Sequence, residues 1–409
     1  MILPTRADLA ARDAADPLAP VRDRFALPAG ILYLDGNSLG PLPAATPARL
    51  AQVISGEWGD GLIRSWNDAG WIDLPLAIGD RLAPLLGAAP GSVIACDSVT
   101  VNLFKLAGAA LAMRPGRKVI VCEADDFPTD RHVLEGLAAV SGARIRAVPR
   151  GSAAAALGPD TALVLLTHVH YASGHVHDMA ALSAAVTAAG ALSLWDLSHS
   201  AGALHLALDT DGADMAVGCG YKYLNGGPGA PAFAFVAQRH HAALLPPLRG
   251  WMGHAEPFGF SDHWTPAPGI RRLLAGTPPI LALAALDAGI ATFDGIDMTA
   301  AEAKSRELVA VFAVLAAARC PGTSVETPSP GTRHGCQIIV RHPDARRVMA
   351  ALIARGVIGD MRPPDRMRFG FPALYTRFVD AWDAVEILAD VLASGAWQDA
   401  RFDRLGVVS

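Results

Sequence analysis

The sequence predicts an α/β fold, with a mostly parallel sheet in a large domain followed by a smaller α/β domain. Short apolar runs alternate with Ala- and Leu-rich stretches through the middle of the chain, a pattern typical of parallel strands joined by helices that cover both sheet faces. A second set of strands and helices follows a long helical stretch near residue 300. At 409 residues the chain is long enough for two domains.

The large domain is expected over residues 31–290. Its predicted strands are 118–122, 162–166, 192–196 and 232–236, and its helices include 130–141 and 179–189. The strand runs are apolar throughout, which is typical of strands buried on both faces.

The small domain is expected over residues 291–409, and residues 1–30 are expected to pack against it. It begins with a predicted helix over 299–319 and a link rich in Pro, Gly and Ser over 321–335. The elements predicted after the link are a strand over 337–341, a helix over 344–355, a strand over 366–370 and a helix over 379–392.

Composition excludes several classes of protein. The 34 basic and 39 acidic residues give a net charge of −5, without the basic stripe of a nucleic-acid-binding protein. The longest apolar run, 308–318, is shorter than the ~18 residues of a membrane span. The N-terminus has no apolar signal region. Five widely spaced cysteines without a CxxC pair indicate reduced thiols rather than disulfides or a metal site, so we expect a cytoplasmic protein.

Two residues near predicted strand ends suggest a ligand site, because ligands of open α/β sheets bind beyond the carboxyl ends of the strands. Asp196 ends the strand 192–196 and is placed to keep a ligand's ring nitrogen protonated. Its alternative role is to cap the next helix. Lys222 lies before a Gly-rich turn, where a partly desolvated amine can form a Schiff base. A surface lysine is the alternative, but the pairing with Asp196 favours a functional role.

Other loops carry weaker signals. Phe127, in the segment FPTD (127–130), suits stacking on a flat ring, while Thr129 and Asp130 offer polar contacts or a helix N-cap. The segment DSVTVN (97–102) places Thr100 and backbone N–H groups at a helix N-terminus, which suits a phosphate.

Three further residues lie in polar or aromatic segments. Trp251 and Thr277 could reach a phosphate through an indole N–H and a hydroxyl, or could belong to structural turns. Arg368, at a predicted strand end, suits bidentate binding of a carboxylate. The alternative for Arg368 is a surface ion pair, a role for which three neighbours have an equal claim: Arg362, Arg366 and Arg377.

Ordered blocks along nearly the whole chain resemble the kynureninase family. They are LYLDGNSLGPLP (32–43), FPTD, WDLSHSAGA (195–203), GCGYKYLNGGPGAPAF (218–233), GWMGHAEPFGF (250–260), GTPPILALAAL (276–286) and RFGFPALYTRF (368–378). The resemblance implies the type I fold of pyridoxal-phosphate aminotransferases and the cofactor pyridoxal 5'-phosphate. It implies hydrolysis of L-kynurenine, or its 3-hydroxy form, to anthranilate or 3-hydroxyanthranilate and L-alanine in tryptophan breakdown. It also implies a homodimer with shared active sites.

The resemblance also implies roles for individual residues. Lys222 would hold the cofactor and later remove the substrate α-proton, and Tyr221 would transfer protons in later steps. Arg368 would bind the substrate carboxylate, and Ser38 and Trp66 would lie near the aryl pocket. The implied cofactor-binding residues are Val99, Thr100, Phe127, Asp130, Asp196, His199, Tyr221 and Lys222, with Trp251 and Thr277 arriving from the neighbouring subunit.

The chain departs from the family pattern beside the expected site. His170 stands where the family usually has Asn, and Ala172 and Ser173 stand where a basic residue and Thr are commoner. Gly220 replaces a hydroxyl residue often found before the Tyr–Lys pair. These changes bear on substrate preference and rate more than on cofactor binding.

Two alternative functions share this fold. A cysteine desulfurase or selenocysteine lyase needs a cysteine on a mobile loop as sulfur acceptor, and Cys336 is the one late candidate near an arginine. A non-catalytic pyridoxal-phosphate-binding module predicts damaged catalytic positions or an attached DNA-binding segment. The resemblance favours neither.

Overall fold

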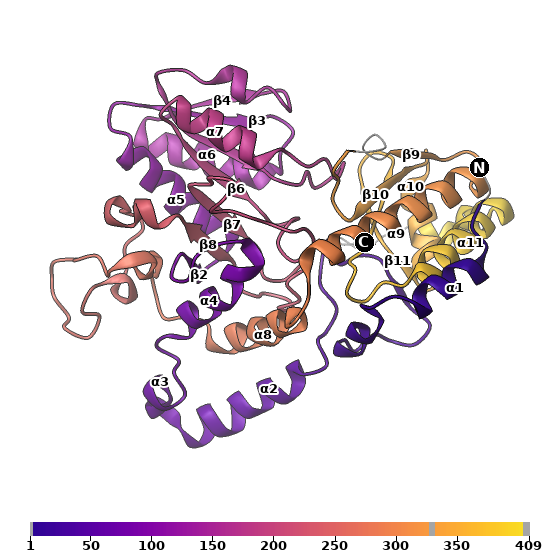
Figure 1. Cartoon of the computed structure of the whole chain (residues 1–409), viewed down its shortest axis with the longest axis horizontal. Helices are drawn as coiled ribbons and strands as arrows, with labels where there is room; N and C mark the ends of the chain where they lie inside the picture. Colours follow the sequence, from indigo (N-terminus) through magenta and orange to yellow (C-terminus); the bar gives the residue numbers. More distant parts are fainter. Residues whose placement is uncertain (1–2, 327–331, 404–409) are drawn as a thin grey trace.

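The computed structural model describes residues 3–326 and 332–403 and contains a seven-stranded sheet, which lies in the left-hand part of the view in Figure 1. Strands β3 to β7 run parallel, while β8 is antiparallel to both of its neighbours. In spatial order the strands are β2 (Val93–Ala95), β8 (Phe233–Val236), β7 (Met215–Gly218), β6 (Leu192–Asp196), β5 (Thr161–Thr167), β3 (Val119–Glu123) and β4 (Arg144–Val148). All four strands predicted for the large domain are present, within a residue of their expected ends.

The sheet is buried on both faces, as its continuous apolar runs predict. Along β5, Leu163 and Leu165 belong to one core, and Val164 and Leu166 belong to the other, because successive strand residues point to opposite faces. Helices α5 (Val99–Met113) and α6 (Pro128–Ser141) supply the first core. Helices α4 (Leu74–Leu86), α7 (Met179–Ala188) and α8 (Ile280–Ile290) supply the second.

A second, four-stranded sheet follows later in the chain and is antiparallel throughout. Its order is β12 (Asp360–Arg362), β13 (Arg366–Gly370), β10 (Gln337–Arg341) and β9 (Ser324–Glu326). Helices α9 (Met298–Arg319), α10 (Ala345–Ala354) and α11 (Phe378–Ser394) build a separate apolar core with this sheet. The predicted link 321–335 contains the unexpected strand β9, and its residues 327–331 lie outside the described part of the chain.

The N-terminal helix α1 (Arg6–Ala14) lies beside α11 (Figure 1). Arg6 pairs with Asp383 at 2.7 Å, and the Asp13 carboxylate accepts hydrogen bonds from the first two N–H groups of α11. Strand β1 (Leu32–Tyr33) then pairs in parallel with β11 (Val357–Ile358). This pairing joins the segment after α1 to the C-terminal part of the chain. The domain boundaries at residues 30 and 290 stay predictions.

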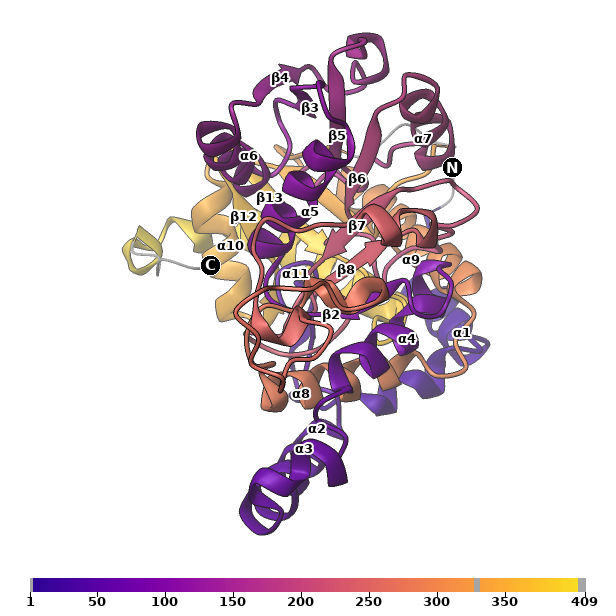
Figure 2. The same ribbon diagram turned by 90° about the vertical axis from the view of Figure 1, so that its left-hand side faces the viewer.

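A helical arm projects from the body of the molecule in both ribbon views (Figures 1 and 2). It comprises α2 (Thr46–Gln52), a π-helical stretch over Val53–Asp60 and α3 (Ser65–Asp68). Several large apolar side chains of the arm are exposed: Ile54, Trp58, Leu62 and Ile63. Across residues 3–326 and 332–403, no helix combines the length and apolar character needed to cross a bilayer.

Candidate active site

A cavity of about 170 Å³ lies where the carboxyl ends of β5 and β6 meet the start of α5 and the loop after β7. Eight sequence-predicted residues line it: Val99, Thr100, Phe127, Asp130, Asp196, His199, Tyr221 and Lys222. The other lining residues are Thr129, Thr167, Tyr171 and Ser198. The structure therefore brings together the cofactor-binding residues that the sequence assigned to one subunit.

Two buried acids lie side by side in this cavity. Asp196 ends β6, and its Oδ1 accepts a hydrogen bond from the Ser198 N–H at 2.8 Å. No helix begins there, so the helix-cap alternative for Asp196 is wrong. Asp130 is buried, and within the described residues neither of its carboxylate oxygens has a hydrogen-bond partner. Burial and the charge of Asp196 raise the pKa of Asp130 well above its usual range.

Lys222 is partly buried and lines the same cavity as the two acids. Its Nζ lies 3.0 Å from Nε2 of His199, and burial together with the Lys222 charge holds the pKa of His199 well below its usual range. The surface-lysine alternative is therefore wrong. Lys222 lies four positions past the end of β7, in a turn rather than at the strand end itself.

The N-terminal segment NSLG (37–40) fixes the backbone of this turn. The Gly40 N–H donates to the Tyr221 carbonyl at 2.8 Å. A Cβ at Gly40 would lie 2.3 Å from the Lys222 carbonyl oxygen, so only glycine permits this approach.

The N-terminus of α5 lines one part of the cavity through Val99 and Thr100. Ser98 is the N-cap and accepts a hydrogen bond from the Val101 N–H at 3.3 Å, which leaves Val99 and Thr100 in the first turn. Free N–H groups at a helix N-terminus favour anions. The predicted N-cap for α6 is wrong, because that helix begins at Pro128 with Phe127 in the cap position. Thr129 and Asp130 instead face the cavity from the first turn.

Arg368 is fully buried beside the loop that carries Ser38. It pairs with Asp360 through Nε and Nη2, donates to Ser38 from Nη2, and donates from Nη1 to the Tyr171 carbonyl at 2.6 Å. These four contacts use four of the five N–H groups of a guanidinium. The surface ion pair expected as an alternative does not describe Arg368.

The three neighbouring arginines make other contacts. Arg366 and Arg377 pair with other acids, whereas Arg362 shares Asp360 with Arg368, and none of the three lines the cavity. The pairs are Arg362 with Asp360, Arg366 with Glu326 and Arg377 with Asp380.

Five predicted site residues do not line the cavity of this chain: Ser38, Trp66, Trp251, Thr277 and Arg368. Trp66 packs edge-on against Trp71 in the arm, with ring centroids 6.0 Å apart. Trp251 is 40% exposed and packs against Phe258, and Thr277 is exposed. The role of Trp251 and Thr277 in another subunit stays a prediction.

Tyr171 is a cavity residue that the sequence reasoning missed. Its ring packs edge-on against Phe127 at 5.3 Å, and its carbonyl holds Arg368. The signal was its position after the strand 162–166, at the same sheet edge as Asp196.

Two of the departures from the family pattern have a structural setting. His170 and Ser173 contact each other, with Nδ1 of the histidine 2.7 Å from the serine Oγ. A Cβ at Gly220 would lie 2.3 Å from the Pro231 carbonyl oxygen, so a hydroxyl residue does not fit there without movement. Among residues 3–326 and 332–403 no cluster of three or more His, Cys, Asp or Glu side chains is arranged for a metal ion.

Comparison with known proteins identifies the family. Residues 301–388 match a family model described as the kynureninase C-terminal domain. A protein named kynureninase from Burkholderia pseudomallei (strain 1106a) is 50% identical over 97% of this chain and 98% of its own length. The chain belongs to the kynureninase family. A second member, from Pseudomonas fluorescens, is 47% identical with the same coverage of both chains.

Solved structures confirm the predicted fold. The cysteine desulfurase from Thermococcus onnurineus NA1 superposes with a TM-score of 0.78 at 18% identity, covering 92% of this chain and 98% of that one. The cysteine desulfurase CsdA from Escherichia coli gives 0.77 at 20% identity, covering 92% and 99%. At this identity the likeness concerns the fold alone.

Proposed function

We propose that this member of the kynureninase family hydrolyses L-kynurenine to anthranilate and L-alanine, with pyridoxal 5'-phosphate attached to Lys222. One observation carries the proposal: the Lys222 amine and the Asp196 carboxylate line the same cavity, at the carboxyl edge of a parallel sheet. The relatives named kynureninase, nearly full-length and about half identical, supply the reaction.

The residues present fit this cofactor. Lys222 supplies the amine for its aldehyde, Asp196 supplies a carboxylate for a protonated ring nitrogen, and Phe127 supplies an aromatic face. The first turn of α5, with Thr100, supplies donors for its phosphate. The unpartnered carboxyl oxygens of Asp130 suit a cationic ring beside Asp196. When bound, the cofactor supplies an electron sink for negative charge that develops on the substrate carbons.

The chain's own residues would have separate roles in the reaction. Arg368, with Ser38 beside it, binds the substrate α-carboxylate. The Lys222 amine would take the substrate α-proton. Water adds to the γ-carbonyl, the Cβ–Cγ bond breaks to release anthranilate, and protonation of the three-carbon remainder yields alanine. Burial raises the pKa of Tyr221, so its phenol keeps a proton to deliver at these later steps.

The alternative functions have weaker support. Cys336 is 1% exposed, and burial raises the pKa of its thiol to about 11, which is the opposite of what a sulfur acceptor on a mobile loop requires. A non-catalytic module would have lost catalytic positions, whereas the sequence retains Lys222, Asp196 and Arg368, and the first two line one cavity.

The proposed assembly is a homodimer in which Trp251 and Thr277 complete the cofactor site of the partner. The support is their exposure outside this chain's own cavity and the unpartnered apolar surface of the arm. An apolar cavity of about 410 Å³ beside that surface is lined by Trp58, Trp71 and the start of α8. Exposed apolar surface of this kind favours a subunit interface.

The proposed compartment is the cytoplasm. All five cysteines are free and buried, which suits a reducing environment.

Steady-state kinetics test the proposed function. Purified holoenzyme is given L-kynurenine or 3-hydroxy-L-kynurenine, and the anthranilate product is followed by fluorescence. We expect saturable turnover of at least one of the two, with one alanine released per aryl product. Release of sulfide from cysteine without cleavage of either kynurenine would overturn the proposal.

A further inference from the structure

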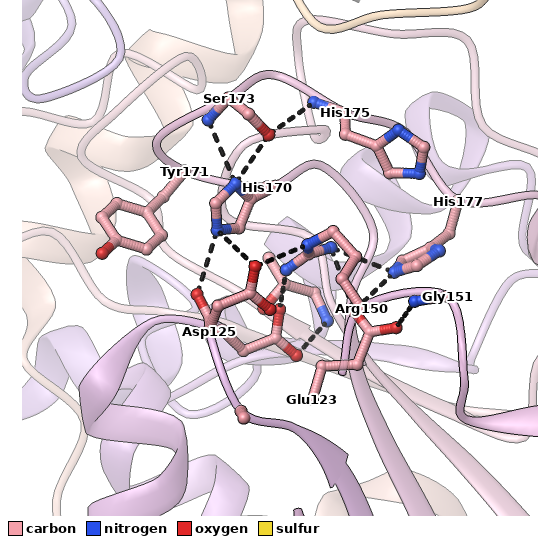
Figure 3. Close-up of polar contacts among 12 residues, drawn as sticks. Glu123, Asp125, Arg150, Gly151, His170, Tyr171, Ser173, His175 and His177 are labelled. Atoms are coloured by element: carbon pink, nitrogen blue, oxygen red, sulfur yellow. Dashed lines mark hydrogen bonds and ion pairs between the residues drawn. The ribbon is translucent and has the colours of Figure 1, made fainter. Parts of the chain in front are cut away.

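A largely buried polar cluster lies where β3 and β4 end, and of its side chains only that of Asp125 is exposed (Figure 3). We call it the Arg150 cluster, and its members are Glu123, Asp125, Asp126, Arg150, His170 and His177. Three of them are acids within four residues of the β3 terminus, and Arg150 follows the neighbouring parallel strand β4 by two residues. None of the six lines the cavity.

Arg150 is the cation that holds these acids together. Its guanidinium lies 2.7 Å from an oxygen of Asp126, 3.0 Å from one of Glu123 and 3.3 Å from one of Asp125. Glu123 and Asp126 are buried, and burial raises the pKa of Asp126 to about 6 even with the arginine beside it. Without Arg150 the cluster would contain buried, uncompensated carboxylates, which is strongly unfavourable.

The cluster joins two loops of the site. Glu123 accepts from Nε2 of His177 at 2.8 Å, and the His177 N–H donates to the His168 carbonyl at 3.0 Å, which closes the loop 168–177. His170 connects the same loop to the β3 end, because its Nε2 donates to the Asp125 carbonyl at 3.0 Å. Asp126 also accepts from the Thr167 N–H at 3.3 Å, at the end of β5.

The loop that this cluster holds carries Tyr171. The Tyr171 carbonyl accepts from Nη1 of Arg368 at 2.6 Å and from Nε2 of Gln337 at 2.9 Å. The Tyr171 ring packs against Phe127, one residue after Asp126. The loop therefore supplies one of the four contacts that orient the Arg368 guanidinium, beside its two bonds to Asp360 and one to Ser38. The turn that carries Lys222 is held by different contacts, namely the Gly40–Tyr221 backbone hydrogen bond and the contact between Lys222 and His199.

We propose that Arg150 is a positioning residue for substrate binding: through the loop 168–177 it orients Arg368 toward the substrate carboxylate, without taking part in cofactor attachment. This rests on the proposed function in placing that carboxylate at Arg368. Arg150 acts on the strength of amino-acid binding, and the chemical step at Lys222 is left unchanged.

The test compares Arg150→Gln and Arg150→Lys holoenzymes with a matched control, Arg146→Gln. Arg146 lies on β4 itself and pairs with Asp160, outside the cluster. For each protein, KM and kcat are measured with L-kynurenine, and the dissociation constant of L-alanine is measured from the change in cofactor absorbance. The alanine measurement needs no turnover.

We expect Arg150→Gln to raise KM and the alanine dissociation constant by about tenfold or more, with normal cofactor content and kcat within about threefold of wild type. Arg150→Lys should recover part of the loss, because a point charge contacts fewer carboxylates than a planar guanidinium. The control should bind both ligands normally.

Several outcomes would overturn the proposal. They are unchanged binding in Arg150→Gln, an equal loss in Arg146→Gln, loss of cofactor instead of amino-acid affinity, or failure of both Arg150 variants to fold, which would assign the cluster to stability alone. If wild type binds alanine but does not cleave kynurenine, the proposed function fails while the role of Arg150 is still decided by alanine affinity.

Discussion

The amine of Lys222 and Nε2 of His199 lie 3.0 Å apart in a cavity where the histidine ring is buried. Burial and the lysine charge both lower the pKa of His199, so the ring is neutral at physiological pH and accepts from the amine. In the described part of the chain no carboxylate lies within 4.0 Å of the Lys222 amine. The Lys222 amine is therefore oriented by a hydrogen bond to an uncharged ring rather than by an ion pair.

Replacing this lysine should abolish turnover. We expect Lys222→Ala to lower kcat by at least about 10³-fold and to remove the absorbance of the Schiff base with bound cofactor. The matched control is Lys118→Ala, since Lys118 contacts only a backbone carbonyl near the surface. Absorbance spectra and anthranilate fluorescence check both changes, and residual activity near the wild-type level would contradict the assignment.

Replacement of each of the two buried acids by asparagine should have unequal effects on kcat. Burial and the charge of Asp196 raise the pKa of Asp130, which favours its neutral form, and an amide of the same shape resembles that form. The kcat of Asp130→Asn should therefore lie within about tenfold of wild type, whereas the kcat of Asp196→Asn should fall by about 10²-fold or more. Steady-state kinetics on cofactor-loaded proteins check this order, and the reverse order would exchange the roles of the two residues.

The raised pKa of Asp130 also predicts a pH dependence of stability for the cofactor-free protein. A carboxyl whose pKa is higher in the folded state contributes fully below its unfolded value, and this contribution is lost as pH rises through the folded value. Asp130→Asn removes that loss. Its melting temperature relative to wild type should therefore increase from pH 5.5 to pH 8.5, as scanning calorimetry can measure. A constant difference would mean that Asp130 does not titrate as described.

The sequence predicted most elements that are buried on both faces. The strands 192–196, 337–341 and 366–370 were located to the residue, because short apolar or alternating runs of this length fit few structures besides a buried strand. Strand β9 was missed because Ser324 is exposed and the strand lies at a sheet edge within a Pro- and Ser-rich segment. Such a segment carries no apolar pattern.

The site could be predicted where a residue lies at the carboxyl end of a strand, as Asp196 does at the end of β6. Tyr171 was missed because its contact with Arg368 is made by a backbone carbonyl, which any residue supplies. The Arg150 cluster was equally inaccessible, since its members come from three separate segments and meet only through the sheet order.

Mixed dimers should reveal shared active sites. If Trp251 serves the partner's site, Lys222→Ala and Trp251→Ala subunits are each inactive or weak alone, but a mixed dimer contains one intact site. Random mixing at equal amounts should then restore about a quarter of wild-type activity, because half of the dimers are mixed. Refolding the two variants together and measuring anthranilate formation checks this. The control mixes Lys222→Ala with Lys222→Ala carrying a tag, and equal activity in both mixtures would contradict the shared site.

Gly220 should resist the hydroxyl side chain that its relatives often have. In this chain the position of a Cβ is only 2.3 Å from the Pro231 carbonyl and 3.0 Å from a Leu286 methyl, so Gly220→Ser must displace backbone beside Lys222. We expect a loss of about 1–3 kcal/mol in the free energy of unfolding, measured by urea denaturation of the holoenzyme. Gly136→Ser is the matched control, because a Cβ there meets nothing within 4 Å. Equal free energies of unfolding for the two variants would show that residues 230–231 can move without a loss of stability.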